Sequence, residues 1–365
     1  MGTAVKTSAD QALALINDSV RTLKGYHLTP ETCGVKLNQN ENPFDWDKGV
    51  KERVAEFFVE RPWNRYPDFV PDALKSRLAA HVGATPDCVI AGNGSNEMLL
   101  VLMLSFAAKA KSVIVCSPTF SVYRLLSDGM GIRPVNVNMT DGLRYDVPAI
   151  KKAAAGNPGS MLIICSPNNP TGGAIGESEL RDVLSVHTGV CVLDQAYVEF
   201  GGFNGLSLIN EYKNLIVART FSKAMAAAGM RLGYMIGAPE VIAEINKIKL
   251  PYNINFFTEH AASAILDNAA AAQRSVEMII KERDILYDYL KTLPFDNVYP
   301  STANFILIRT KHKQKLFEHL KISDILVRDV SSYPMLENCL RFSIGKPEEN
   351  LLLMESLKSF FLLGL

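Results

Sequence analysis

Short runs of β-branched and other apolar residues alternate with amphipathic segments through the middle of the chain. The apolar runs predict buried strands of about five residues each, at Val113–Ser117, Met161–Ser166, Val190–Asp194, Leu215–Arg219 and Leu232–Ile236. The segments between them predict helices, at Asn96–Ala108, Ser121–Met130, Ser178–His187 and Pro239–Lys249. This alternation predicts an α/β fold in which helices cover both faces of a mainly parallel sheet.

The last third of the chain has a different pattern. A long helical segment, Phe257–Leu290, has a break near Asn268. After it come strand-like and helix-like segments in turn, at Asn304–Ile308, Gln314–Leu320, Ile325–Val330, Cys339–Ile344 and from Pro347 onward. We therefore expect a large domain over residues 38–255 and a smaller α+β domain formed by residues 1–37 and 256–365.

Length, charge and cysteine usage narrow the classes of protein. A chain of 365 residues exceeds the size of one hydrophobic core, which favours two domains. Lys+Arg and Asp+Glu each total 38, and this zero net charge argues against nucleic-acid binding but not against a small anionic ligand. The longest apolar stretch, Met98–Ala108, is shorter than the roughly 20 residues that cross a bilayer.

The N-terminus lacks the basic and apolar regions of a secretory signal. The six cysteines form no CxxC pair, and the six histidines have no metal-ligand spacing. These features predict a cytoplasmic protein without a disulfide framework or a metal site.

Polar residues collect in the loops after the predicted strands, where parallel sheets bind their ligands. Lys223 closes the run Thr220-Phe221-Ser222-Lys223 just past a buried strand. Desolvation there lowers the pKa of a lysine and makes its amine a nucleophile toward an aldehyde. Thr220 and Ser222 carry hydroxyls, and Arg231 has a guanidinium fork suited to phosphate. Taken alone, a Ser-Lys dipeptide is more often a solvent-exposed loop.

Asp194 follows the buried run Val-Cys-Val-Leu and begins the loop that contains Tyr197. A carboxylate at that depth is costly unless a cation, such as a protonated pyridine nitrogen, pairs with it. Capping of the following helix is the alternative, and for Asp194 alone it is the better one. The rigid turn Ser166–Gly172 holds the Asn169 amide toward a planar ligand, or is an ordinary strand-to-helix connection.

The turn that contains Gly94, Ser95 and Asn96 precedes a long apolar helix, so its backbone N–H groups form an anion site. Such turns are common and are weak evidence singly. Tyr123 lies early in a predicted helix, where its ring stacks on a flat cofactor or belongs to the core.

One ligand satisfies all of these loops together. It is flat and has an aldehyde for Lys223, a ring nitrogen for Asp194, a hydroxyl for Asn169 and Tyr197, and a phosphate for Ser95, Ser222 and Arg231. Pyridoxal phosphate has each of these groups, and a lysine Schiff base with an acidic partner for the ring nitrogen is its binding signature.

The ordered motifs SPNNPTG, DQAY, TFSK and GMRLGY, between Ser166 and Tyr234, resemble the aspartate-aminotransferase superfamily of pyridoxal-phosphate enzymes. With GNGSNE, Tyr123 and Arg341, the resemblance covers nearly the whole chain. Within that superfamily the chain is most similar to the histidinol-phosphate aminotransferases, through LNQNENP, NRYPD, LVRD and CLRFSIG.

This resemblance implies an aspartate-aminotransferase-like fold and a ping-pong transamination through a Schiff base on Lys223. The reaction interconverts L-histidinol phosphate plus 2-oxoglutarate and imidazole-acetol phosphate plus L-glutamate. The resemblance also implies a homodimer, because it assigns Tyr66 to the cofactor phosphate of the neighbouring subunit. Arg341 is implied as the substrate carboxylate ligand, and Arg328 and Tyr26 as further substrate contacts.

Other functions stay open at this stage. A threonine-phosphate decarboxylase has nearly the same loops, and an aromatic amino-acid aminotransferase shares the carboxylate arginine. A nucleotide-binding oxidoreductase shares the parallel sheet but needs GxGxxG, and GNGSNE lacks the third glycine. A non-catalytic regulator would require loss of Lys223, which is present.

Overall fold

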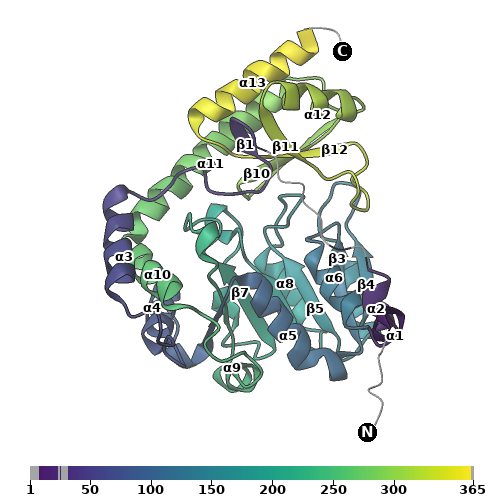
Figure 1. Ribbon diagram of the computed structural model, residues 1–365. Coiled ribbons are helices and arrows are strands. Elements are labelled where there is room, and N and C mark those ends of the chain that lie inside the picture. The colour runs from purple at the N-terminus through teal and green to yellow at the C-terminus, as the bar shows by residue number, and fades with distance from the viewer. Residues whose placement is uncertain (1–7, 24, 26–31, 363–365) are drawn as a thin grey trace.

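A seven-stranded sheet forms the centre of the larger part of the molecule, as the computed structural model of residues 8–23, 25 and 32–362 describes it (Figure 1). Its strands are, in spatial order, β2 (Val89–Gly92), β8 (Gly233–Ile236), β7 (Leu215–Thr220), β6 (Cys191–Asp194), β5 (Met161–Cys165), β3 (Ser112–Ser117) and β4 (Arg133–Asn138). The strands from β7 to β4 run parallel, whereas β8 is antiparallel to both of its neighbours. The predicted mainly parallel sheet is confirmed.

Helices cover both faces of this sheet because its strands alternate apolar side chains between the faces. On β7, Leu215 and Val217 join one apolar cluster, and Ile216 and Ala218 join another. The first cluster includes residues of α4 (Asp72–Val82), α7 (Val147–Gly156) and α8 (Glu177–Leu184). The second includes residues of α5 (Ser95–Ala110), α6 (Val122–Gly129) and α9 (Pro239–Asn246).

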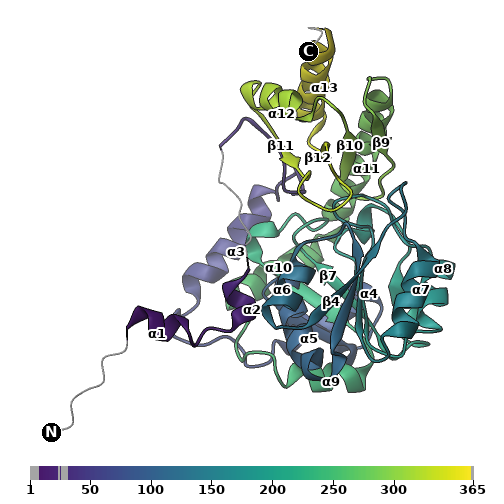
Figure 2. The same ribbon diagram turned by 90° about the vertical axis from the view of Figure 1, so that its right-hand side faces the viewer.

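A second sheet of five strands forms the smaller part, at the opposite end of the molecule from α9 (Figure 1, Figure 2). Its order is β1 (Val35–Leu37), β11 (Ile325–Asp329), β12 (Cys339–Ser343), β10 (Phe305–Arg309) and β9 (Asn297–Tyr299). Three helices share an apolar cluster with it, namely α11 (Ala269–Lys291), α12 (Lys313–Ile322) and α13 (Pro347–Leu362).

The break predicted near Asn268 is confirmed, because this residue leaves helical geometry between α10 (Phe256–Asp267) and α11. α10 packs against α4 and α3 (Lys48–Glu60), and α11 continues to the small sheet. Short 3₁₀ turns complete the described elements, at η1 (Pro86–Cys88), η2 (Val198–Phe200), η3 (Gly205–Leu208) and η4 (Ala228–Met230).

The N-terminal segment divides between the two parts. Of its helices α1 (Ala9–Leu13) and α2 (Asp18–Arg21), α2 lies against α6, where the Ser19 hydroxyl donates to the Gly129 carbonyl at 2.9 Å. By contrast, β1 pairs in parallel with β11 of the small sheet. The domain limits of 38–255 and of 1–37 with 256–365 stay a prediction. None of the helices described here is long and apolar enough to cross a membrane.

Candidate active site

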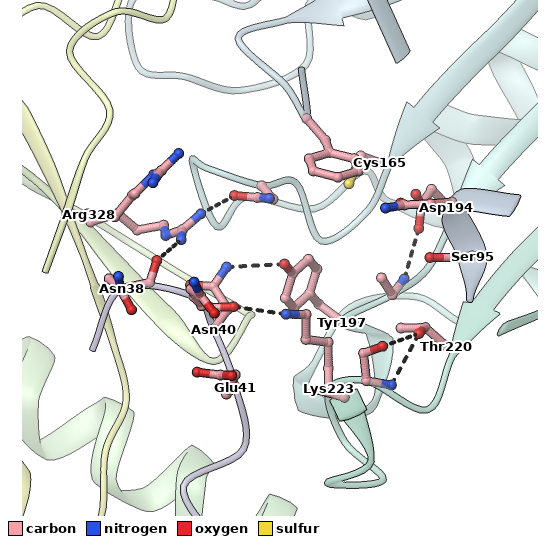
Figure 3. A pocket seen from close by; sticks show the side chains of 18 of the residues that line it. Asn38, Asn40, Glu41, Ser95, Cys165, Asp194, Tyr197, Thr220, Lys223 and Arg328 are labelled. Carbon is pink, nitrogen blue, oxygen red and sulfur yellow. Dashed lines mark hydrogen bonds between the residues drawn. The ribbon is translucent and has the colours of Figure 1, made fainter. Parts of the chain in front are cut away.

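A cavity of about 470 Å³ lies at the carboxyl ends of β5, β6 and β7, between the two sheets (Figure 3). Parallel strands end at the same edge of a sheet, and therefore the loops SPNNPTG, DQAY and RTFSK meet there. The cavity brings together most of the residues singled out from the sequence, namely Ser95, Asn96, Tyr123, Asn169, Asp194, Tyr197, Thr220, Ser222, Lys223, Arg231, Arg328 and Arg341.

The Lys223 amine points into this cavity. Its Nζ donates to the Gln39 carbonyl at 2.9 Å and lies 5.8 Å from the centre of the Tyr197 ring (Figure 3). Desolvation, as the largest cause, and the positive charges of Arg341 and Arg231 lower the pKa of Lys223 to about 7, against an opposing effect of the Glu41 carboxylate. A large fraction of the amine is therefore neutral at neutral pH, and only the neutral amine attacks an aldehyde.

Asp194 ends β6 and is 3 % exposed. Its carboxylate accepts hydrogen bonds from the Tyr123 hydroxyl at 2.6 Å and from the Ala196 backbone at 3.1 Å. Burial raises the pKa of Asp194, and these two hydrogen bonds act in the opposite direction. Neither donor carries a positive charge, and so the site has a place for a protonated ring nitrogen as counter-ion.

Tyr123 is a buried residue that lines the cavity, and stacking of its ring on the cofactor stays a prediction. Tyr123 is only 1 % exposed, and its hydroxyl donates to Asp194. Phe120, in the loop between β3 and α6, also lines the cavity, with its ring 5.6 Å from the Tyr123 ring in an edge-on arrangement. The sequence signal for Phe120 was present, because it belongs to the SPTF loop after a buried strand.

Hydroxyl, guanidinium and helix-terminal N–H groups meet at another end of the cavity. Gly94 has φ 84° and precedes α5, so Ser95 supplies the first backbone N–H group of a 16-residue helix. Arg231 donates to the Ser222 hydroxyl at 3.3 Å, and Ser222 lies 3.0 Å from the Thr220 hydroxyl. A side chain at Gly94 would place its Cβ 2.6 Å from Arg231 Nη2. These groups form an anion site that Gly94 borders without lining the cavity.

The small sheet contributes two arginines to the opposite wall. Arg341 on β12 is buried, and it donates to the Asn38 carbonyl at 2.8 Å and to the Asn169 side-chain oxygen. Its guanidinium carbon also lies 5.2 Å from the centre of the Phe305 ring. Arg328 on β11 is directly opposite Arg341 in the strand register. The two guanidinium groups therefore come from adjacent strands to one cavity.

The segment that follows β1 is part of the site, although the sequence assigned it no role. Asn38, Gln39, Asn40 and Glu41 all line the cavity. The Asn40 amide donates to the Tyr197 hydroxyl at 3.1 Å, which fixes the ring beside Lys223 (Figure 3). The signal for this segment was its run of polar residues directly after a strand, in the motif LNQNENP.

Tyr66 and Tyr26 are the remaining residues that the resemblance singles out. Tyr66 is outside the cavity, 77 % exposed, and its ring stacks on Tyr252 with centres 4.6 Å apart. Tyr26 lies outside the residues that the structure describes.

The sequence profile of the family "Aminotransferase class I and II" matches residues 33–357. The chain belongs to this family, whose members use pyridoxal phosphate.

Among its relatives, the histidinol-phosphate aminotransferase of Chlorobaculum tepidum is 38 % identical over 94 % of this chain and 99 % of its own length. The corresponding enzyme of Chlorobium phaeobacteroides is 39 % identical over 94 % of this chain and 96 % of its own. A solved structure of histidinol-phosphate aminotransferase from Sinorhizobium meliloti, in complex with pyridoxal-5′-phosphate, has the same fold. The TM-score is 0.84 at 22 % identity, and the match covers 95 % of this chain and 98 % of the other chain.

The residues of the cavity fit this cofactor. Lys223 offers a desolvated amine for the aldehyde, and Asp194 offers a buried carboxylate without a cationic donor among its hydrogen bonds. Phe120 supplies an aromatic ring at the wall, and the start of α5 with Arg231 supplies an anion site for the phosphate. This donor set matches the chemical groups of pyridoxal phosphate.

Proposed function

We propose that this protein interconverts L-histidinol phosphate plus 2-oxoglutarate and imidazole-acetol phosphate plus L-glutamate, the aminotransferase step of histidine biosynthesis. The relatives described above, which carry that name and align over nearly the whole chain, support the proposal. The structural observation that carries it is the pair Arg341 and Arg328, which come from adjacent strands and line the same cavity as Lys223. Both partner substrates are anionic, and guanidinium groups bind carboxylate and phosphate alike.

Pyridoxal phosphate supplies an aldehyde and an electron-accepting ring when it is bound. Lys223 would hold the aldehyde carbon, and its free amine, with a pKa of about 7, would carry a proton between the substrate α-carbon and the C4′ atom of the cofactor. Asp194 keeps the proton on the ring nitrogen, because a buried carboxylate favours a cationic partner. Asn169 and Tyr197 hold the ring hydroxyl.

The cofactor phosphate is held by the anion site at the start of α5. Its ligands are the backbone and side chain of Ser95, with Gly94 and Asn96 beside it, and the side chains of Thr220, Ser222 and Arg231. Because this site lies away from Arg341, the cofactor phosphate and the substrate anion do not compete for one cation.

Arg341 binds the anion next to the reacting carbon, which is the α-carboxylate of glutamate or the phosphate of histidinol phosphate. Arg328 binds the side-chain carboxylate of glutamate, and Tyr26 is a further substrate contact. One cavity thereby serves both halves of a ping-pong cycle.

The active unit is a homodimer in the cytoplasm, and Tyr66 binds the cofactor phosphate of the neighbouring subunit. Its exposed position supports this, since its ring stacks on the exposed Tyr252 ring, which in turn contacts the exposed Phe69 ring. Exposed patches of this kind mark contact surfaces between proteins. Cys116, Cys165 and Cys191 are buried among apolar side chains, and the cytoplasm would keep their thiols reduced.

A panel of amino donors tests the proposed reaction. The purified holoenzyme is assayed with 2-oxoglutarate and one donor at a time, namely histidinol phosphate, phenylalanine, tyrosine, aspartate or threonine phosphate. We expect the highest kcat/KM for histidinol phosphate, and no carbon dioxide from threonine phosphate. A preference for phenylalanine, or decarboxylation of threonine phosphate, would contradict the proposal.

A further inference from the structure

The loop between β11 and β12 reaches from the small sheet to the edge of the large one. The backbone N–H of Tyr333 donates to the Val330 carbonyl at 3.1 Å, and that of Leu336 donates to the Tyr333 carbonyl at 3.2 Å. Tyr333 packs against a buried apolar cluster that includes Val330 and Leu336. Two turns and an apolar cluster therefore fix the position of this residue.

The hydroxyl of Tyr333 reaches the other sheet. Its oxygen lies 3.4 Å from the hydroxyl oxygen of Ser121, which immediately precedes α6. Ser121 also follows Phe120, whose ring lines the proposed cofactor cavity. Tyr333 therefore contacts the loop that precedes α6, and the same loop contributes Phe120 to the proposed cofactor cavity.

Tyr333 forms part of the wall between two cavities. The second cavity has a volume of about 580 Å³ and is lined in part by Thr119, Ser121, Arg124 and Ser332. It shares Phe120, Tyr123, Arg328 and Tyr333 with the proposed active site. A substrate group that points away from Arg341 toward Arg328 meets this shared wall.

The two amino donors differ in the group that they would place there. Glutamate has a carboxylate, which suits the Arg328 guanidinium. Histidinol phosphate has an imidazole ring instead. A protonated imidazole is not attracted to a guanidinium group, whereas an imidazole ring packs well on an aromatic face. Within the shared wall, Arg328 and Tyr333 offer these two different surfaces from the same side of the cavity.

We propose that Tyr333 determines specificity for histidinol phosphate by contacting its imidazole ring, while glutamate uses Arg328 in the same space. This inference rests on the proposed function. The hydroxyl contact with Ser121 orients the Tyr333 ring, so the ring face rather than the hydroxyl is the recognition surface.

The test uses single-turnover spectra of the holoenzyme with each amino donor separately. We expect Tyr333→Ala to lower the second-order rate constant for histidinol phosphate about 10- to 100-fold, in the range by which pocket contacts discriminate substrates, and that for glutamate less than about threefold. Tyr333→Phe keeps the ring, and we expect it to stay within about threefold of the wild type with both donors.

Met335→Ala is the matched control, because Met335 packs on the same apolar cluster in the same loop and lines neither cavity. We expect it to leave both rate constants unchanged. If Tyr333→Ala fails to fold, Tyr333→Leu retains most of the buried volume and replaces it in the comparison. Thermal melts of each variant establish that the fold is intact.

Equal losses with both donors, or no loss with histidinol phosphate, would overturn the inference and leave the proposed function intact. If the wild-type enzyme transaminates glutamate but does not convert histidinol phosphate, the proposed function fails, and the inference fails with it. The wild-type measurement alone therefore separates the two failures.

Discussion

Lys223 is half-buried at the cavity, within the electrostatic influence of two guanidinium groups, and this environment governs its reactivity. Desolvation, Arg341 and Arg231 together lower its pKa to about 7. Since the amine reacts when it is neutral, we expect the cofactor-free protein to bind pyridoxal phosphate with a rate that rises with pH through a midpoint near 7. Stopped-flow absorbance over a range of pH measures this midpoint.

Arg341→Met is the informative companion variant, because loss of a neighbouring positive charge raises the pKa of Lys223 and moves the midpoint to higher pH. A wild-type midpoint near the ordinary lysine value of about 10.4 would contradict the desolvated position of the amine.

The hydroxyl of Tyr123 is a second single group on which cofactor binding depends. It donates to the buried Asp194 carboxylate at 2.6 Å and so stabilises the charged form that pairs with the cofactor ring nitrogen. Hydrogen bonds to charged groups contribute about 1.5–3 kcal/mol, so we expect Tyr123→Phe to weaken cofactor binding roughly tenfold or more. Equilibrium dialysis of the cofactor measures the change.

Tyr145→Phe is the matched control for Tyr123→Phe. Tyr145 is also buried, but its hydroxyl donates to the Cys165 carbonyl and not to Asp194. This variant should lose some thermal stability and keep its affinity for the cofactor. Equal losses of affinity in the two variants would mean that the bond to Asp194 has no special part in cofactor binding.

At the scale of elements, the contact between β8 and the start of α5 sets the geometry of the phosphate site. A Cβ at Gly233 would lie 2.1 Å from the Ser95 backbone nitrogen and 2.4 Å from the Gly94 carbonyl carbon. Gly233→Ala must therefore displace the first turn of α5, and we expect cofactor affinity to fall at least about tenfold together with stability.

Gly156→Ala, at the end of α7, is the control, since its Cβ would meet no atom within 4 Å. Cofactor titration and thermal melts of both variants measure the two effects. A Gly233→Ala protein with wild-type cofactor affinity would show that the close approach of β8 to α5 is not needed.

Two strands of the large sheet were not predicted from the pattern of apolar residues, and their sequences explain why. β4 (Arg133–Asn138) contains Pro134 and has Val137 as its one buried residue, so this edge strand reads as a loop. β2 (Val89–Gly92) is fully buried, but its sequence Val-Ile-Ala-Gly ends in two residues that are depleted in strands, which weakens its signal. The central strands were predicted within one residue or two, because long apolar runs bounded by polar loops occur where a parallel sheet is covered on both faces.

The candidate site was predictable where residues follow central strands, as Lys223 and Asp194 do. Contacts that depend on how the two sheets pack were not predictable from local pattern. The Gln39 carbonyl reaches Lys223 across 184 positions of sequence, and Tyr333 reaches Ser121 across 212. These pairs are set by tertiary packing, which the spacing of motifs does not encode.

At the scale of the whole molecule, the proposed dimer predicts that two impaired variants complement each other. We expect a mixture of Tyr66→Phe and Lys223→Ala subunits to be more active than the sum of the separate variants. In a hybrid dimer with shared sites, both lesions fall in one site and the other site is wild type. Activity after mixing and subunit exchange measures this effect.

Arg231→Ala mixed with Lys223→Ala is the control, because Arg231 and Lys223 line the same cavity of one chain and their hybrids contain no wild-type site. Restoration in the control but not with Tyr66→Phe, or a fully active monomer in sedimentation, would contradict the shared-site dimer.

The central claim is that one cavity exchanges an amino group between histidinol phosphate and 2-oxoglutarate. A sequential single-turnover experiment tests it most directly, in which stoichiometric histidinol phosphate and then 2-oxoglutarate are added to the holoenzyme. We predict that the first addition removes the absorbance of the Lys223-bound cofactor with release of imidazole-acetol phosphate, and that the second restores it with release of glutamate. A spectrum that histidinol phosphate leaves unchanged, in an enzyme that responds to glutamate, would contradict the claim.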